Sequence, residues 1–364
     1  MNFSHTSTDI NANPMGTDGF EFVEYTAADP MLLGSLFEKL GFSAVAKHRS
    51  KDVVLYRQGD INFIVNRETG SRGQRFARDH GPSACAVAFR VRDAAAAHER
   101  ALQLGAADVP GSIGPMELNI PGIEGIGGST IYLVDRYKNP TIYDIDFVPI
   151  QGADPHPFGV GLVSIDHLTN NVFRGRMDLW TDYYERIFNM REIRYFDIEG
   201  RLTGLKSRAL TSACRKIRIP INESSDDKSQ IEEYLLLYRG EGIQHIALAT
   251  DDIFVTVKCL REKGVKFASP PPDAYYEALV DRLPGHGEDL AALKSNGVLL
   301  DGSVDGGRRL LLQIFTETVI GPIFFEIIQR KGDEGFGEGN FKALFESMER
   351  DQIRRGVLAD KAMR

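Results

Sequence analysis

The sequence predicts an α+β protein made of two similar halves. Each half contains two stretches with the apolar spacing of an amphipathic helix, and strand-like apolar segments lie between them. Several segments of the first half match segments of the second in pattern, which indicates an internal duplication. The length of 364 residues allows about two or three domains, each large enough to bury a core.

The four helical segments are expected at corresponding places in the two halves. In the first half they cover residues 30–42 and 92–106, and both end near a glycine suited to the position just after a helix. In the second half they cover residues 176–190 and 251–265. The aromatic residues of the third segment fall at helical spacing, so we interpret them as a packing face.

Strands are predicted between these helices. Residues 53–66 are typical of a hairpin that turns at Gln58–Asp60. Two further strand-like segments of the first half resemble segments of the second half in pattern. These pairs show which positions of the two halves correspond. The paired segments are 84–93 with 243–252, and 139–147 with 321–329.

Three strand-like segments of the second half each contain one residue that a buried strand disfavours. These residues are His167, His245 and Glu326. A carboxylate flanked by phenylalanine and isoleucine is costly to bury unless it is paired or binds a metal. Two imidazoles and one carboxylate that face one cavity form the facial triad of non-haem Fe(II) oxygenases. Two hydrogen-bonded core histidines and a buried salt bridge would use the same residues.

The alignment of the halves helps to choose between these interpretations. Ala86 stands where the second half has His245, and Asp144 is the nearest match to Glu326. Residues 21–25 offer no counterpart to the first histidine. Core histidines have no reason to survive in only one half, so the comparison favours a metal site in the second half and none in the first.

Composition and charge limit the class of partner and the compartment. The formal net charge is −8 and no Lys/Arg-rich run occurs, which argues against nucleic acid or an acidic membrane surface as a partner. No stretch is long and apolar enough to span a membrane, and no signal peptide is recognised. Cys85, Cys214 and Cys259 are scattered and odd in number, so they are expected to be reduced thiols in a cytoplasmic protein.

Composition shifts along the chain predict its domain boundaries. The segment around residues 151–160 contains proline and glycine and is expected to be a linker. Residues 111–128 look too irregular for a regular element and are expected to cover the domain surface. The predicted organisation is a disordered tail over 1–18, a first domain without metal over 19–150, the linker, and a catalytic domain over 161–364.

The C-terminal segment is expected to close over the site. Residues 330–358 are a glycine-rich loop followed by an amphipathic helix, for which Asn340 is the expected N-cap. The apolar face of this helix would be Phe341, Leu344, Phe345 and Met348. The GFGEGN sequence is not a phosphate-binding loop, because no Lys-Ser/Thr follows it and no Rossmann unit surrounds it. A mobile lid is the better interpretation.

At these residues the second half closely resembles the 4-hydroxyphenylpyruvate dioxygenase family of the vicinal-oxygen-chelate superfamily, with the bacterial members the best match. The likeness extends over nearly everything after about residue 19. In the first half it is carried by FEFVEY, HRSKDVVLYRQGDINFIVN and GPSACAVAFRV. In the second half it is carried by IDHLTNNV, GLKS, RIPINE, GEGIQHIALAT, LLLQIFTETVIGP and FFEIIQRKGDEGFGEGNFKALFESMERDQ.

The resemblance implies a fold and a set of site residues. The fold would be two tandem open barrels of mixed β-sheet, each built from paired βαβββ modules, with a C-terminal lid helix. One Fe(II) per subunit would bind to His167, His245 and Glu326, without 2-oxoglutarate, flavin or nicotinamide. The catalytic set would be this metal centre with Gln313 and Asn222. Strand alternation would point Gln244 away from the metal unless a bulge re-aims it. The substrate-binding residues would be Ser207, Asn222, Gln230, Gln244, Gln313, Phe315, Phe324, Phe336, Asn340 and Phe341.

The resemblance also implies a reaction. The enzyme would use O₂ for the oxidative decarboxylation, ring hydroxylation and side-chain migration that turn 4-hydroxyphenylpyruvate into homogentisate in tyrosine and phenylalanine catabolism. It would act as a homo-oligomer, a tetramer or a dimer. Hydroxymandelate synthase is one alternative, although Phe315 and the loop of Asn222 favour the dioxygenase. A non-catalytic ligand-binding member of the superfamily is another, as is a glyoxalase or ring-cleaving enzyme.

Overall fold

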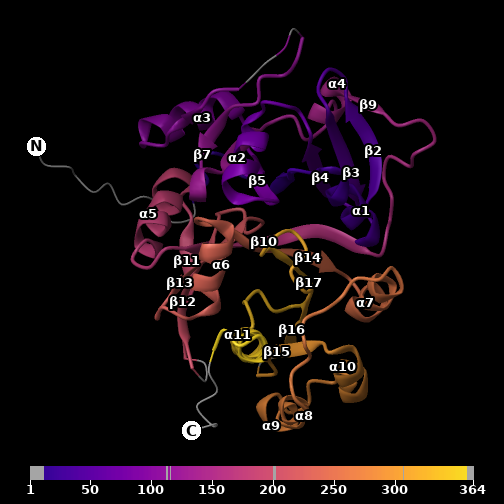
Figure 1. Cartoon of the computed structure of the whole chain (residues 1–364), viewed down its shortest axis with the longest axis vertical. Helices are drawn as coiled ribbons and strands as arrows, with labels where there is room; N and C mark the ends of the chain where they lie inside the picture. Colours follow the sequence, from indigo (N-terminus) through magenta and orange to yellow (C-terminus); the bar gives the residue numbers. More distant parts are fainter. Residues whose placement is uncertain (1–11, 112–113, 115, 200–201, 306, 359–364) are drawn as a thin grey trace, which may run out of the picture.

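The computed structural model describes residues 12–111, 114, 116–199, 202–305 and 307–358. Two curved, open sheets of mixed strands form the framework, one in each half of the chain, so the expected α+β fold of two open barrels is confirmed (Figure 1). The first sheet has the strand order β6-β7-β8-β5-β1-β4-β3-β2-β9 over the described residues. The second has the order β11-β12-β13-β10-β14-β17-β16-β15.

The elements of the first half follow the hairpin and helix pattern of the sequence. The strands are β1 (Phe20–Thr26), β2 (Ser43–His48), β3 (Val53–Gln58), β4 (Ile61–Asn66), β5 (Ser83–Arg90), β6 (Asp108–Val109), β7 (Gly122–Glu124), β8 (Thr130–Val134) and β9 (Phe147–Pro149). The helices are α1 (Met31–Lys39), α2 (Arg72–His80), α3 (Ala94–Gln103) and α4 (Ile142–Asp146), with a short 3₁₀ turn over Ile126–Gly128.

The second half has longer strands and more helices. Its strands are β10 (Leu162–Val172), β11 (Arg191–Glu199), β12 (Gly204–Thr211), β13 (Arg218–Ser224), β14 (Gly242–Thr250), β15 (Leu299–Ser303), β16 (Arg309–Phe315) and β17 (Phe324–Lys331). Its helices are α5 (Met177–Phe188), α6 (Gln230–Tyr238), α7 (Ile253–Glu262), α8 (Asp273–Glu277), α9 (Leu279–Arg282), α10 (Leu290–Asn296) and α11 (Glu338–Arg354).

The four helices expected from periodicity are present as α1, α3, α5 and α7. In the first half, the glycines expected after the helices, Gly41 and Gly105, have φ of 89° and 87°, a conformation that favours glycine. The hairpin of β3 and β4 turns as expected, since Gln58 lies opposite Ile61. Helices α2, α6 and α8 to α10 were not expected.

The same strand arrangement recurs in the two sheets. Strand β1 is parallel to β4 and antiparallel to β5, just as β10 is parallel to β13 and antiparallel to β14. Strand β8 then pairs parallel with β5, as β17 pairs parallel with β14. The structure therefore carries the duplication that the sequence pattern indicates.

One expected correspondence between the halves is wrong. Asp144 was aligned with Glu326, but it lies in helix α4, where it forms a capping box with Thr141. The register identifies Tyr132 of β8 as the counterpart of Glu326. Tyr132 lies opposite Ala88, and Glu326 lies opposite Ala247 in the equivalent strand pair. The apolar spacing of 139–147 misled because its strand, β9, is only three residues long and follows that helix.

Two segments expected to lack regular structure differ in part. Of the tail expected over 1–18, residues 1–11 lie outside the described residues, whereas Met15 and Thr17 are buried. In the segment 111–128, residues 112, 113 and 115 also lie outside the described residues. Its remainder contributes strand β7, which lies between β6 and β8 in the first sheet, and does more than cover a surface.

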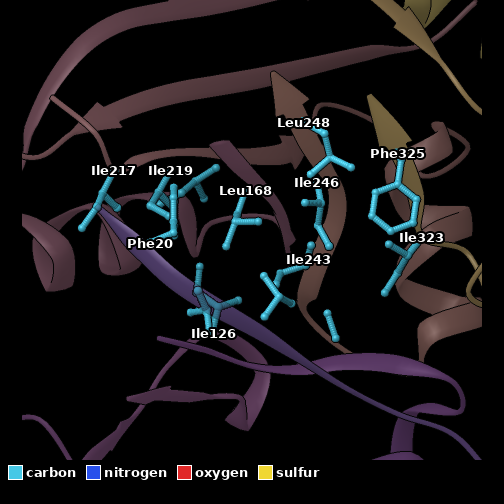
Figure 2. Packing of buried hydrophobic residues seen from close by; sticks show 14 of the residues in the cluster. Phe20, Ile126, Leu168, Ile217, Ile219, Ile243, Ile246, Leu248, Ile323 and Phe325 are labelled. Atoms are coloured by element: carbon cyan, nitrogen blue, oxygen red, sulfur yellow. The ribbon is translucent and has the colours of Figure 1, made fainter. Parts of the chain in front are cut away.

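The two halves share one hydrophobic core. Figure 2 shows part of it, with Ile243 and Ile246 of β14 and Phe325 of β17 packed toward the first half. The ring of Phe63 on β4 stacks on Phe325, with ring centroids 5.9 Å apart. Among the described residues, no helix has the length and apolar character needed to cross a bilayer.

Candidate active site

The three residues singled out from the sequence meet on one face of the second sheet. They lie on three neighbouring strands: His167 on β10, His245 on β14 and Glu326 on β17. His167 is opposite Ala247, and Ala247 is in turn opposite Glu326. His245 precedes Ala247 by two positions, so its side chain points to the same face. The small side chain of Ala247 leaves the space into which the three larger ones converge.

The distances between the donor atoms fit a metal ion. Nε2 of His167 lies 3.3 Å from Nε2 of His245, and Oε2 of Glu326 lies 3.2 Å and 3.3 Å from these two nitrogens. Ligands held at right angles about 2.2 Å from a metal lie about 3.1 Å apart. The three atoms therefore have the spacing of one face of a coordination octahedron, with the other positions left for exchangeable ligands.

Hydrogen bonds fix which nitrogen of each histidine is available. Nδ1 of His167 lies 2.8 Å from the carboxylate of Asp166, and Nδ1 of His245 lies 3.0 Å from the amide oxygen of Gln244. Both partners are acceptors, so each Nδ1 carries the hydrogen and a neutral ring turns its Nε2 lone pair toward the other donor atoms. Two lone pairs and a carboxylate oxygen facing one another repel unless a cation lies among them. The donor set therefore fits a divalent metal.

Burial and charge set the protonation of these groups. Burial alone would raise the pKa of the Glu326 carboxyl, but the two imidazoles outweigh burial and lower that pKa to about 2. Burial lowers the pKa of His245. Burial would do the same for His167, but the neighbouring carboxylate of Glu326 raises its pKa. Glu326 is therefore an anion at neutral pH, as a metal ligand must be.

Each ligand is held from behind by a further polar group. Asp166 accepts two hydrogen bonds from one edge of the Arg330 guanidinium, from Nε at 2.7 Å and from Nη2 at 2.8 Å. The amide nitrogen of Gln244 donates to Gln230 of α6, at 3.0 Å. Nε2 of Gln313 donates to Oε1 of Glu326, at 2.7 Å, which leaves Oε2 for a metal. These contacts fix ring and carboxylate orientation, as in well-formed metal sites.

A small cavity of about 30 Å³ lies directly in front of the three ligands. Its walls come from the sheet and from the C-terminal segment. Two polar atoms in these walls, Oδ1 of Asn222 and Oγ1 of Thr169, are buried and have no hydrogen-bond partner within the described structure. Unpartnered buried acceptors are uncommon and indicate a place where a ligand group binds. The lining residues are His167, Thr169, Phe196, Ser207, Pro220, Asn222, His245, Gln313, Phe315, Glu326, Phe336, Phe341 and Leu344.

The expected substrate residues divide into two groups. Those that line the small cavity are Ser207, Asn222, Gln313, Phe315, Phe336 and Phe341. Ser207 and Asn222 are neighbours because β12 and β13 pair them directly. Phe324 instead stacks on the outer side of the His245 ring, with centroids 4.9 Å apart. The others that lie outside the cavity are Gln230, Gln244 and Asn340.

The structure adds to the prediction for Gln244 and corrects the prediction for Asn340. A bulge does occur at Gln244, because Thr169 pairs with His245 whereas Asn170 pairs with Ile243. The bulge lets Gln244 bind the back of His245 and does not bring it into the cavity. Asn340 is not the N-cap of α11, since Gly337 holds that position. Its side chain is fully buried and contacts Gln313.

Sequence reasoning did not select Thr169, Phe196, Pro220 and Leu344. Thr169 follows His167 by two positions on one strand, so alternation would have placed it on the metal face. Phe196 and Leu344 are apolar residues in apolar patterns, and nothing in the sequence separates them from ordinary core residues.

A larger cavity of about 700 Å³ lies on the other side of Phe315 and Leu344, which line both cavities. It is bounded mainly by α6, α11 and the loop between β16 and β17. Its walls include Gln230, Gln244 and Phe324, which support His245 from the outer side.

Comparison with known proteins gives matches over most of the chain. Residues 11–148 match the family model described as the N-terminal part of hydroxyphenylpyruvate dioxygenase. Residues 164–289 match that of the glyoxalase, bleomycin resistance protein and dioxygenase superfamily.

Several curated proteins are similar along their whole length. Hemolysin VllY of Vibrio vulnificus is 62% identical, and the match covers 95% of this chain and 98% of that protein. The 4-hydroxyphenylpyruvate dioxygenase of Pseudomonas aeruginosa is 60% identical, with 95% and 97% covered. That of a Pseudomonas strain is 58% identical, with 96% and 99% covered.

Two solved structures share the fold. A fusion of a xylose isomerase-like TIM barrel with 4-hydroxyphenylpyruvate dioxygenase has a TM-score of 0.78 and 36% identity, covering 93% of this chain and 54% of that chain. A triple mutant of 4-hydroxymandelate synthase from Streptomyces coelicolor has a TM-score of 0.81 and 26% identity, covering 93% of this chain and all of that chain.

Proposed function

The chain belongs to the 4-hydroxyphenylpyruvate dioxygenase family, and from this premise we propose how its second sheet carries out the family's reaction. The enzyme converts 4-hydroxyphenylpyruvate and O₂ to homogentisate and CO₂. The proposed centre is one Fe(II) ion held by His167, His245 and Glu326. The observation that carries this proposal is the convergence of three donor atoms, 3.2–3.3 Å apart, with their remaining polar atoms already hydrogen-bonded.

The chemistry divides between the metal and the protein. When bound, Fe(II) supplies the redox chemistry with O₂, and the 2-oxo acid group of the substrate supplies electrons as it loses CO₂. The chain's residues bind the substrate, orient its ring and keep water out. Gln313 holds Glu326 in one orientation and lines the cavity, so it serves both the ligand and the substrate.

Polar residues that line the cavity would recognise the phenol. The free acceptor of Asn222 and the hydroxyls of Ser207 and Thr169 lie on strands β10, β12 and β13. A buried phenol hydroxyl needs such partners, because leaving it unsatisfied costs roughly 1–3 kcal/mol. A substrate without the hydroxyl would leave the same protein atoms unpaired, which gives selectivity for the hydroxylated ring.

Aromatic residues would enclose the ring. Phe336 packs edge-on against His167, with centroids 5.3 Å apart, and Phe341 packs against Phe196 at 5.8 Å. Phe336 and Phe341 belong to the C-terminal segment. The cavity of about 30 Å³ is too small for an aromatic ring with a three-carbon side chain, since one water already needs roughly 10–15 Å³. This segment must therefore move to admit substrate and then return to exclude water.

The assembly and boundaries of the enzyme complete the proposal. We assign catalysis to residues 161–364, and residues 19–150 to a structural domain without metal. Exposed Leu236 and Leu237 on α6 support association into a dimer or tetramer. The three free cysteines support a reducing, cytoplasmic setting.

The first experiment is anaerobic loading with Fe(II), followed by aerobic turnover of 4-hydroxyphenylpyruvate with identification of the aromatic product. Homogentisate is expected, and His245→Ala should abolish both turnover and tight metal binding. His156→Ala removes an exposed histidine outside the site and should leave both unchanged. Hydroxymandelate as the product would contradict the proposal that this pocket forms homogentisate. A folded, iron-loaded protein that consumes no O₂ would indicate a ligand-binding member of the superfamily.

A further inference from the structure

A chain of hydrogen bonds leads from Glu326 to Tyr275 of α8, a residue outside the cavity. Gln313 donates to Oε1 of Glu326 at 2.7 Å, and Asn340 donates to the amide oxygen of Gln313 at 2.7 Å. The hydroxyl of Tyr275 then donates to Oδ1 of Asn340, also at 2.7 Å. All three links are short, and Glu326, Gln313 and Asn340 are each at most 3% exposed.

The direction of this chain is fixed at both ends. Glu326 is an anion and can only accept, so the amide nitrogen of Gln313 must face it. The oxygen of Gln313 then faces Asn340, which must present its own nitrogen there and its oxygen to Tyr275. A flip of either amide would place two acceptors against each other in a buried site, which costs about 1–3 kcal/mol.

The Tyr275 hydroxyl has two acceptors within reach, and the nearer one is Oδ1 of Asn340. The backbone N–H of Leu300 donates to the Tyr275 oxygen at 3.0 Å, and Arg282 donates to it at 3.3 Å. The carbonyl of Leu300 lies 3.1 Å from the same hydroxyl and also accepts from Arg282. The oxygen of Asn340 is nearer, at 2.7 Å, and is the better acceptor for the proton.

We propose that Tyr275 is a positioning residue for the metal centre, acting through Asn340 and Gln313 to hold the Glu326 carboxylate with one oxygen turned to the metal. The proposal deepens the proposed function and depends on metal binding by the three ligands. Asn340 lies in the first turn of α11, so the chain is complete only when the C-terminal segment is closed. Tyr275 thereby links closure of that segment to the geometry of a metal ligand.

The test replaces Tyr275 by phenylalanine and keeps the ring. Tyr276→Phe is a matched control, because the two tyrosines are neighbours on α8 and the buried hydroxyl of Tyr276 has no hydrogen-bond partner in the described residues. Metal-free protein is titrated with Co²⁺, whose visible spectrum reports the ligand geometry. Each variant is compared with its own metal-free form by thermal unfolding, so a loss of fold stability is separated from a loss of metal affinity.

Changes to groups that support metal ligands typically cost 10–100-fold in affinity. In the chain of hydrogen bonds, Tyr275 lies two links further from the metal than Gln313. Tyr275→Phe should therefore weaken Co²⁺ binding about three- to tenfold and alter the visible spectrum. Tyr276→Phe should do neither. In a Gln313→Leu background, Tyr275→Phe should have no further effect, since the chain is already broken.

Two results would overturn the proposal. In the first, the Tyr275→Phe variant has the same Co²⁺ affinity and the same visible spectrum as the Tyr276→Phe variant. The second is an unchanged effect of Tyr275→Phe in the Gln313→Leu background, which would mean that Tyr275 acts by another route. If the wild-type protein itself binds no Co²⁺, the result contradicts the proposed metal centre and not only the role of Tyr275.

Discussion

Asp166 and Arg330 form a buried ion pair directly behind His167, one of the three proposed metal ligands. The side chain of Asp166 is 5% exposed and that of Arg330 is 13% exposed. Burial alone would raise the pKa of Asp166, but the hydrogen bonds and charge of Arg330 lower it well below the usual value. Arg330 also donates to the carbonyls of Asp333 and Gly335, so one guanidinium holds both the ligand support and the loop that carries Phe336.

Removing Arg330 leaves the buried Asp166 carboxylate with only a weaker charged partner, because Nη1 of Arg218 lies 3.6 Å from it. Arg330→Met should therefore lower the free energy of unfolding by up to about 3–5 kcal/mol. Asp166→Asn in the same chain should recover part of this loss, because the remaining side chain is neutral. Denaturant unfolding measures both. Arg174→Met, which breaks an exposed pair with Asp227, should lower the free energy of unfolding far less than Arg330→Met. Equal losses for the two arginine variants would contradict the role of burial.

The convergence of the three proposed metal ligands could be predicted at this scale, but the groups that support them could not. His167, His245 and Glu326 stand out because each interrupts an apolar strand in the sequence. Asp166 lies within β10 and Arg330 near the end of β17, and nothing in the sequence separates them from ordinary charged residues. Their pairing depends on the register of β10, β14 and β17, which brings together positions 164 residues apart.

Helix α11 begins at a residue that only glycine fits. Gly337 is its N-cap and has φ of 67°. A Cβ at this position would lie 2.6 Å from the amide oxygen of Gln313. That amide is held between Glu326 and Asn340, so it cannot move without breaking one of the two hydrogen bonds. The start of the helix is therefore in direct contact with the polar support of the site.

Gly337→Ala should open this end of α11. The left-handed backbone costs an alanine about 1–2 kcal/mol, and the new methyl group would also displace the Gln313 amide. Gly356→Ala is the matched control, since Gly356 follows α11, has φ of 77° and has open space around it. We expect kcat/KM to fall about tenfold more in Gly337→Ala than in Gly356→Ala, which corresponds to about 1.4 kcal/mol. Faster proteolysis within 332–358 should accompany the loss. Equal effects of the two substitutions would rule out a role for the contact.

Some helices and strands were predicted correctly and others were not, and the differences have physical reasons. The long helices and the β3–β4 hairpin have strong periodicity and clear turn residues, so they were placed correctly. Residues 142–146 alternate like a strand, yet the capping box of Thr141 and Asp144 starts a helix there. Asn340 looks like an N-cap, but the earlier turn at Gly337 starts α11 sooner and frees the Asn340 side chain for the site.

The two halves are coupled through their shared core. Phe63 of β4 is fully buried and stacks on Phe42 at 4.4 Å and on Phe325 at 5.9 Å. Phe325 is next to Glu326, a proposed metal ligand, on β17. The first half therefore supports the strand that presents this side chain, although it carries no group of three possible metal ligands among its described residues.

Phe63→Ala should destabilise both halves together. Replacing a buried phenylalanine leaves a cavity and costs about 3–5 kcal/mol. The only tryptophan, Trp180, lies in α5 of the second half, so its fluorescence reports that half, whereas far-UV circular dichroism reports the whole chain. If the core is shared, both signals should shift to lower denaturant by the same amount. Phe158→Ala removes a side chain that is 77% exposed and should shift neither. A Trp180 transition that stays at the wild-type midpoint, while circular dichroism shows an earlier step, would mean that the halves unfold independently.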